Sequence, residues 1–195
     1  MKEQAAAANI QIQDLEERGY RIVYIDEMCI TKSTIPTHAY SPMKKPVEID
    51  LRSFSKTTVA VLAGISKQKG MELVMQFDKS VNTDKFIQYI QKLRFAHPFD
   101  QIALFMDRLS VHTCRRSRDQ MAFLGFEVIL NAVYSPEYNP IETVFSIVKG
   151  NIKKQRLRQF MRKEDEDLKS ISEKEFNNIK KETCVNLIRH SMNKL

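Results

Sequence analysis

Residues 21–26 have the sequence RIVYID, in which an almost unbroken apolar run ends in the carboxylate of Asp26. Residues 101–107, QIALFMD, repeat this pattern and end in Asp107. Such runs are typical of strands buried on both faces of a sheet. Ligand sites in α/β proteins form where these strands end, so both carboxylates are candidate site residues. An Asp in an ordinary turn after a strand would give the same pattern.

The remaining segments predict an α/β fold, with a mixed sheet and helices packed on it. Two apolar or β-branched runs, 56–65 and 71–77, flank a Gly-containing turn and predict a hairpin. The other expected elements are a leading helix over 9–18, a loop or edge strand over 44–54, a helix capped by residues 82–84, a helix over 113–124, a strand over 126–130, a long helix after Pro140 and one more helix beyond residue 170.

The composition indicates a globular, intracellular protein that does not bind a membrane. Its 195 residues suffice for one domain with a buried core, and 43% of them are hydrophobic. No apolar run approaches the roughly 20 residues of a membrane span, and the N-terminus lacks a signal-peptide layout. Cys29, Cys114 and Cys184 show no metal-ligand spacing and are expected to be reduced thiols.

The basic residues concentrate in one segment. Residues 143–163 contain seven Lys or Arg and no Asp or Glu, which equals the net charge of +7 of the whole chain. A one-sided block of this kind is typical of proteins that bind a polyanion such as nucleic acid. It is equally typical of a solvated helix face, because the acidic run 164–167 (EDED) follows directly. Charge alone leaves both interpretations open.

Glu142 is a third candidate carboxylate, at the start of the expected long helix. Asn139 and Pro140 fit the N-cap and the first position of that helix, so Glu142 could be a capping-box residue. The apolar stripe that should face the core consists of Ile141, Val144, Phe145, Val148 and Ile152. A neighbouring stripe contains Glu142, Ser146, Lys149, Lys153 and Arg156. A carboxylate that begins a basic stripe favours a nuclease-like site, in which the basic residues contact a phosphate backbone.

Three oxygen donors without His or Cys partners favour the hard ions Mg²⁺ or Mn²⁺. Two such ions, roughly 3.5–4 Å apart, can activate a water or a 3′-hydroxyl and stabilise the leaving oxygen of in-line phosphoryl transfer. Asp26, Asp107 and Glu142 are therefore candidate catalytic residues and candidate ligands for such ions.

Three blocks of the sequence carry a family resemblance: residues 24–27 (YIDE), 105–112 (FMDRLSVH) and 134–142 (YSPEYNPIE). Together they resemble the D-D-E catalytic domain of mariner-superfamily transposases. The third block is close to the S-P-D-L-N-P-I-E signature of that family. The 34 residues between Asp107 and Glu142 are typical of one large branch of it. The resemblance covers roughly residues 20–155. We expect an extension or leading helix over 1–19, a catalytic domain over 20–160 and a helical extension over 161–195.

The resemblance implies a ribonuclease-H-like fold, with a mixed five-stranded sheet flanked by helices. It implies that Asp26, Asp107 and Glu142 hold two Mg²⁺ or Mn²⁺ ions, and that the reaction is DNA cleavage followed by strand transfer. The implied partners are transposon-end DNA, target DNA and further copies of the chain in the DNA complex. The implied location is the nucleus of a eukaryotic host, or otherwise the cytoplasm or nucleoid.

Arg108 stands where the family usually has Asn. Its guanidinium could pair with Asp107 or Glu142 and compete with the metal ions, or it could turn outward and hold a DNA phosphate. The outward role is favoured because all three carboxylates are retained. The expected DNA-binding residues are Arg108, Lys149, Lys153, Lys154 and Arg156.

The family's N-terminal helix-turn-helix region has no counterpart here, so the chain is expected to be a fragment or a specialised derivative. The alternative to an active transposase is a domesticated DNA-binding or assembly protein without catalysis. A ribonuclease or resolvase of the same fold would share the metals but not the block 134–142. Glu27 is expected on the opposite strand face from Asp26, where it would have a structural role or support the metal site without being a ligand. His112 is expected to be a local hydrogen-bond partner near Asp107.

Overall fold

The structure is a computed structural model, and it describes residues 2–31, 58–133, 135–162 and 167–193. The segment 44–54, predicted as a loop or edge strand, lies outside the described residues. None of the described helices is both long and apolar enough to cross a membrane.

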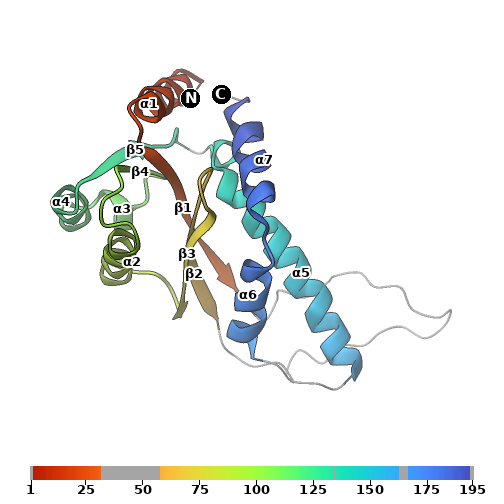
Figure 1. Cartoon of the computed structure of the whole chain (residues 1–195). Coiled ribbons are helices and arrows are strands. Elements are labelled where there is room, and N and C mark those ends of the chain that lie inside the picture. Colours follow the sequence, from red (N-terminus) through yellow and green to blue (C-terminus); the bar gives the residue numbers. More distant parts are fainter. Residues whose placement is uncertain (1, 32–57, 134, 163–166, 194–195) are drawn as a thin grey trace.

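A mixed five-stranded sheet forms the centre of the molecule, in the order β3-β2-β1-β4-β5 (Figure 1). Its strands are β1 (Arg21–Ile30), β2 (Val59–Ser66), β3 (Gly70–Asp78), β4 (Ile102–Met106) and β5 (Phe126–Leu130). The first three pair antiparallel, while β4 runs parallel to both β1 and β5. The predicted hairpin, the two buried strands and the short fifth strand are confirmed.

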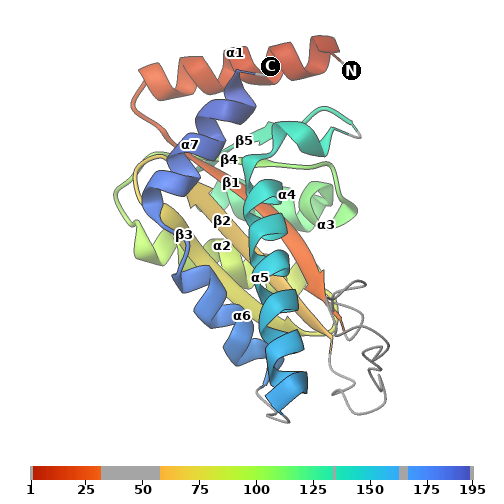
Figure 2. The ribbon, with the colours of Figure 1, turned by 90° about the vertical axis from the view of Figure 1, so that its right-hand side faces the viewer.

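Helices cover both faces of the sheet (Figures 1 and 2). One layer contains α2 (Thr83–Ala96), α3 (Ser110–Thr113) and α4 (Arg115–Phe123). The other contains α5 (Pro140–Arg162), α6 (Leu168–Asn177) and α7 (Lys181–Met192). The helix α1 (Lys2–Glu17) packs against β1 and β5 at one end of the sheet. The cores on the two faces are separate, and α1 shares the one beneath α5, α6 and α7.

Strand alternation divides the side chains of β1 between these two cores. Tyr24 and Met28 belong to the core beneath α5, whereas Val23 and Ile25 belong to the core beneath α2. The same alternation directs Asp26 toward the α5 face and the next side chain of the strand toward the α2 face.

Several elements differ from the prediction in their bounds. β1 does not end at Asp26 but continues to Ile30, because its antiparallel pairing with β2 extends as far as Ile30↔Val59. The helix expected over 113–124 is interrupted by the extended backbone of Cys114 (φ −62°, ψ 153°). The single helix expected beyond residue 170 is two helices, α6 and α7, and the leading helix already begins at Lys2.

Gly70 is required by the docking of α7 as well as by its own backbone. Its φ is +85°, and a Cβ at this position would lie 2.8 Å from the Cα of Lys181. Gly125 has a similar φ of +70°, but a Cβ there would meet nothing within 4 Å. A side chain at either position would lose stability to the left-handed backbone, but only one at Gly70 would also clash with α7. Comparing the two positions therefore separates these two contributions to the free energy of unfolding.

We expect Gly125→Ala to lower the free energy of unfolding by about 1–2 kcal/mol, the ordinary cost of a left-handed non-glycine residue. Gly70→Ala should lower it by a further 1–3 kcal/mol or so, because α7 must shift to admit the methyl group. Urea denaturation of both variants measures the difference. Equal losses would show that α7 does not press on Gly70.

Candidate active site

The three predicted carboxylates line one cavity of about 400 Å³. Asp26 comes from β1, Asp107 follows the end of β4, and Glu142 lies in the first turn of α5. The parallel pairing of β1 with β4 runs from Arg21↔Ile102 to Tyr24↔Phe105, so both Asp residues follow the last paired residues at the same edge. The segment from Asn131 to Asn139 supplies most of the remaining wall.

Asp26 is buried, with 8% of its surface exposed, and both of its carboxylate oxygens accept hydrogen bonds. The Glu27 backbone N–H donates to Oδ1 (2.7 Å), and the Asn139 Nδ2 donates to Oδ2 (3.2 Å). Burial raises the pKa of Asp26 to about 7, and the Glu27 N–H opposes that rise. The negative charges of Glu142 and Asp107 raise the pKa further. The ionised form of Asp26 is therefore costly until a cation is near.

Asn139 does not cap α5 with its side chain, contrary to the sequence interpretation. Its Nδ2 donates to Asp26 and also to the Ile25 carbonyl (3.3 Å), across to β1. Its backbone N–H donates to the Pro136 carbonyl (2.9 Å), so the reciprocal bond of a capping box is absent at this residue. Among the described contacts, the Glu142 carboxylate has no hydrogen bond. The capping-box interpretation of Glu142 is therefore wrong.

Asp107 is held from the opposite face of the sheet. Its Oδ1 accepts from the Leu109 N–H (3.2 Å) and lies 2.8 Å from Nδ1 of His112. The Nε2 of the same ring lies 3.2 Å from Oε1 of Glu27. Burial lowers the pKa of His112, but the hydrogen bonds to Asp107 and Glu27 outweigh it and raise the pKa to about 9. The local hydrogen-bonding role predicted for His112 is confirmed, as is the placement of Glu27 opposite Asp26.

Arg108 lies on the cavity wall without an ion pair to the carboxylates in the described part of the chain. Its Nε donates to the Asn131 carbonyl (3.1 Å) at the end of β5. This bond anchors the base of the guanidinium to the wall. The arrangement does not support the counter-ion role that the sequence left open.

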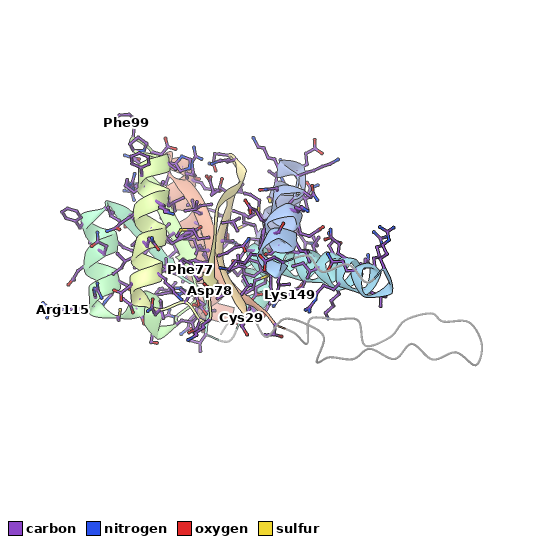
Figure 3. The ribbon with its side chains drawn as sticks, turned by 90° about the horizontal axis from the view of Figure 1, so that it is seen from below. Cys29, Phe77, Asp78, Phe99, Arg115 and Lys149 are labelled. Carbon is purple, nitrogen blue, oxygen red and sulfur yellow. The ribbon has the colours of Figure 1, made fainter. Side chains whose placement is uncertain are left out.

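The basic residues of α5 divide into two sets. Lys153 and Lys154 are exposed, and Lys149, which is labelled in Figure 3, is half-buried. Arg156 is different, because only 6% of its surface is exposed and its Nη1 donates to the Thr31 carbonyl (3.1 Å). Arg156 follows the buried Ile152 by four residues and so remains on the core face of the helix. Arg156 is therefore buried where an exposed position was expected, and its role as a phosphate contact stays a prediction. The five predicted apolar stripe residues of α5 are all buried.

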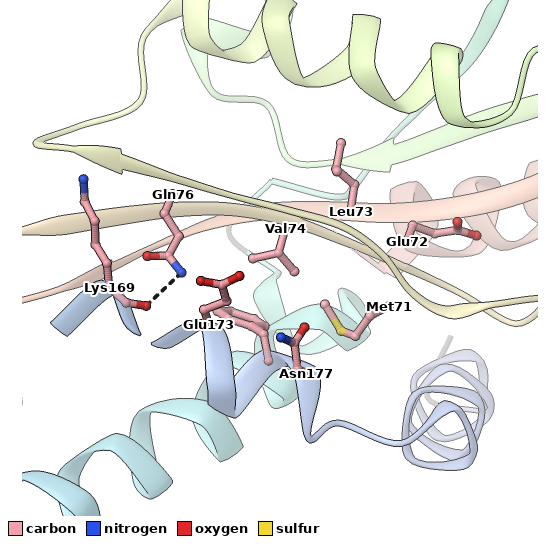
Figure 4. Close-up of a pocket in the computed structure, with 9 residues that line it drawn as sticks. Met71, Glu72, Leu73, Val74, Gln76, Lys169, Glu173 and Asn177 are labelled. Carbon is pink, nitrogen blue, oxygen red and sulfur yellow. Dashed lines mark hydrogen bonds between the residues drawn. The ribbon is translucent and has the colours of Figure 1, made fainter. Parts of the chain in front are cut away.

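A second cavity, of about 510 Å³, lies between β3 and α6 (Figure 4). In it the Gln76 amide donates to the Lys169 carbonyl (3.1 Å), and Glu173 lies beside them. None of the predicted site residues lines this cavity. The carboxylate cavity is therefore the candidate active site, although it is the smaller of the two.

Residues 21–165, well over half of the chain, match the family model described as DDE superfamily endonuclease. The chain belongs to this family. The matched span contains all three carboxylates of the cavity. No curated protein matches the sequence.

The fold of this DDE endonuclease domain is that of the Mos1 mariner transposase. A Mos1 paired-end complex with the left transposon end aligns at a TM-score of 0.73 and 17% identity, over 98% of this chain and 58% of that chain. A Mos1 paired-end complex with Mn gives a TM-score of 0.74 and 18% identity, over 98% and 59%. The Mos1 catalytic domain aligns at a TM-score of 0.64 and 15% identity, over 98% of this chain and 88% of that chain. The predicted mariner resemblance and ribonuclease-H-like fold are confirmed. This chain spans less than two thirds of the Mos1 chains in the complexes.

The donors that this DDE domain presents to the cavity suit a hard divalent cation. They are carboxylate oxygens, and Asn139 adds a buried amide oxygen, Oδ1, that has no hydrogen-bond partner among the described residues. Within the described ranges no three acidic, His or Cys side chains already converge as a ligand set. Like charges repel one another, and both Asp side chains are turned toward hydrogen-bond donors. The residues fit Mg²⁺ or Mn²⁺, and Glu142 would have to approach the two Asp residues.

Asp26→Asn is expected to stabilise the metal-free domain at pH 8 and to lose this effect toward pH 4.5. The pKa of Asp26 in the folded state, about 7, lies above its ordinary value of 3.8. The ionised side chain therefore destabilises the fold, and this loss of stability is complete at pH values above about 7. It fades as the pH falls, because Asp26 then takes up a proton in the folded state. At about 1.4 kcal/mol per pKa unit, the gain at pH 8 should be roughly 2–4 kcal/mol.

Chemical denaturation in EDTA at the two pH values measures this gain in the free energy of unfolding. Asp119→Asn, at an exposed position of α4, is the matched control. An equal gain at both pH values would contradict burial of the charge as its cause.

Proposed function

We propose that this domain is the catalytic domain of a DNA transposase, which cleaves DNA and transfers strands with the help of bound divalent metal ions. The observation that carries the proposal is the cavity shared by Asp26, Asp107 and Glu142. Three separate elements each contribute one of these carboxylates to the wall of that cavity in a DDE superfamily domain, and the mariner resemblance implies that the three are metal ligands.

The solved Mos1 structures support this proposal by analogy. Structures of the Mos1 catalytic domain contain Mn or Mg, and other Mos1 structures are complexes named for a transposon end or for strand transfer. For this chain we propose two ions of Mg²⁺ or Mn²⁺ per active site, held by the three carboxylates. When bound, the ions would activate the attacking water or 3′-hydroxyl and stabilise the leaving oxygen.

The protein residues would supply the geometry of the site. Asn139 and the Glu27 N–H fix both oxygens of Asp26, and His112 with the Leu109 N–H fixes one oxygen of Asp107. The Glu142 carboxylate, without a described hydrogen bond, is free to complete the ligand set. Burial and the acidic neighbours disfavour ionised Asp26. A bound cation would offset the electrostatic cost of that charge.

We propose further that DNA phosphates contact Arg108 beside the carboxylates and the three lysines of α5. Arg108 presents a planar donor group that suits a phosphate. Lys153 and Lys154 are exposed and have no ion-pair partner in the described part of the chain. Assembly into a homo-oligomer on DNA is part of the proposal. So is action in the nucleus of a eukaryotic host, or otherwise in the cytoplasm or nucleoid.

Asp26→Asn, Asp107→Asn and Glu142→Gln are each expected to lower metal-dependent cleavage of duplex DNA by roughly a thousandfold or more, because the three residues act as one unit. Double variants should lose little beyond the single ones. Cleavage of end-labelled DNA in Mn²⁺ or Mg²⁺ measures the activity, and Asp119→Asn is the control.

DNA affinity of the three variants should stay close to that of the unsubstituted chain. If Glu142→Gln kept substantial cleavage, Glu142 would not be part of the site. If the unsubstituted chain bound DNA without cleaving it in either metal, the non-catalytic alternative would replace the proposed enzyme.

Ala substitutions of Lys153 and Lys154 should weaken DNA binding similarly for all sequences and should each reduce the slope of log affinity against log salt by about one unit. Arg108→Asn should have the same effect. Lys92→Ala, on the exposed face of α2, is the control, because it lies in the opposite helical layer. Fluorescence anisotropy across a salt series measures the slope, and an unchanged slope in the triple variant would contradict the phosphate contacts.

A further inference from the structure

His112 is a buried ring with a carboxylate at each nitrogen. Only 1% of its surface is exposed, and it packs against the Phe86 ring with the centroids 4.8 Å apart. Nδ1 faces Asp107 and Nε2 faces Glu27. An ionised carboxylate only accepts hydrogen bonds, so the ring satisfies both neighbours when both nitrogens donate. By binding Nε2, Glu27 thereby fixes the orientation of the His112 ring whose Nδ1 contacts Asp107.

The two oxygens of Asp107 are not equivalent. Oδ1 is engaged by His112 and by the Leu109 N–H, whereas Oδ2 has no hydrogen bond among the described contacts. Asp107 lines the carboxylate cavity, and its side chain is 36% exposed. The hydrogen bonds to Oδ1 therefore leave Oδ2 as the oxygen available to a ligand in the cavity.

The ring is held by three elements, of which β1 alone also contributes a described residue, Asp26, to the cavity. α3 carries His112 itself, β1 supplies Glu27, and α2 supplies Phe86. α3 has only four residues, and its N-cap residue, Leu109, makes no side-chain capping bond. The bond between His112 and Glu27 thus connects a short helix directly to the central strand of the sheet.

We propose that His112, oriented by Glu27, is a positioning residue that fixes Asp107 for metal binding. The inference rests on the proposed metal-dependent function and adds to it two residues, His112 and Glu27, neither of which is a ligand. The role is exerted through Nδ1, which holds Oδ1, so that Oδ2 stays directed to the incoming cation. Partners of this kind typically change metal affinity by about 10–100-fold when removed.

Two substitutions of the same ring separate positioning from simple structural support. In His112→Asn the amide nitrogen takes the place of Nδ1, and so it can still donate to Asp107. In His112→Gln the amide nitrogen takes the place of Nε2, and so it can donate only to Glu27. Each variant keeps one of the two bonds, so their losses of folding stability should be similar.

Mn²⁺ affinity should nevertheless differ between them. We expect His112→Gln to weaken Mn²⁺ binding about 10–100-fold, and His112→Asn to weaken it no more than about threefold. Electron paramagnetic resonance of free Mn²⁺ gives the dissociation constants without DNA or turnover. Thermal unfolding establishes that each variant is folded. The control is His190→Gln, on the exposed surface of α7, which should bind Mn²⁺ like the unsubstituted chain.

Glu27→Gln provides a second route if His112→Gln does not fold. Its amide oxygen can still accept from Nε2 but its amide group can also rotate and present a donor, so the ring orientation is less well fixed. We expect Glu27→Gln to lose less Mn²⁺ affinity than His112→Gln. Where both fold, the double variant should lose no more than His112→Gln alone, because both changes act through Asp107.

The outcomes distinguish the two proposals. Tight Mn²⁺ binding that is equal in the unsubstituted chain, His112→Gln and Glu27→Gln would overturn the positioning role and leave the proposed function intact. Absence of Mn²⁺ binding by the unsubstituted chain would overturn the metal-dependent function and the positioning role with it.

Discussion

β1 and β4 pair in parallel over four residues, and the position of every group in the candidate site follows from that pairing. Parallel strands end at the same edge, so Asp26 and Asp107 come within reach of one cavity although they are far apart in the sequence. On the other side of β1 the antiparallel pairing with β2 continues, so Asp26 projects from a strand that is still held in place. At Asp26, β1 is therefore still paired with β2 on one side but no longer paired with β4 on the other, which leaves room for a ligand beside the carboxylate.

Electrostatic repulsion limits what this geometry can tolerate without a cation. Asp26 is nearly inaccessible to water and has two acidic neighbours, and burial of an unpaired charge is among the most destabilising features that a fold can contain. The surrounding hydrogen-bond donors reduce that cost without removing it. Asp107 is compensated by the ring of His112, whereas Asp26 receives only an amide and a backbone N–H. The remaining imbalance is what the proposed divalent cation would relieve, so the cation-free domain would carry a cost in stability at this position.

Much of this fold could be predicted from apolar runs, because a strand buried on both faces and an amphipathic helix leave clear periodic patterns. The three carboxylates could be found in the same way, since each lies at a boundary of such a run. The hydrogen-bond partners that these residues find in distant parts of the chain could not be predicted. Nothing in the local sequence of Asn139 indicates that its amide reaches Asp26 instead of the helix, or that Glu27 meets His112 85 residues away. The burial of Arg156 was missed for a related reason, because the basic composition of its segment concealed its position one helical turn after the buried Ile152. Helix periodicity, applied strictly, would have identified it.

The long helix α5 is bonded to β1 at two separated points, and this double attachment determines where Glu142 can lie. At its start, Asn139 donates to the Ile25 carbonyl and to Asp26, and further along Arg156 donates to the Thr31 carbonyl after the end of β1. Between them the apolar stripe from Ile141 to Ile152 is completely buried against the sheet. The helix therefore has little freedom to rotate or slide, and the backbone position of Glu142 is as fixed as the strand itself. What remains adjustable is the Glu142 side chain, which has no hydrogen bond among the described contacts. Two restrained carboxylates and a third on a fixed backbone leave the Glu142 side chain as the part of the proposed ligand set that would have to move toward a cation.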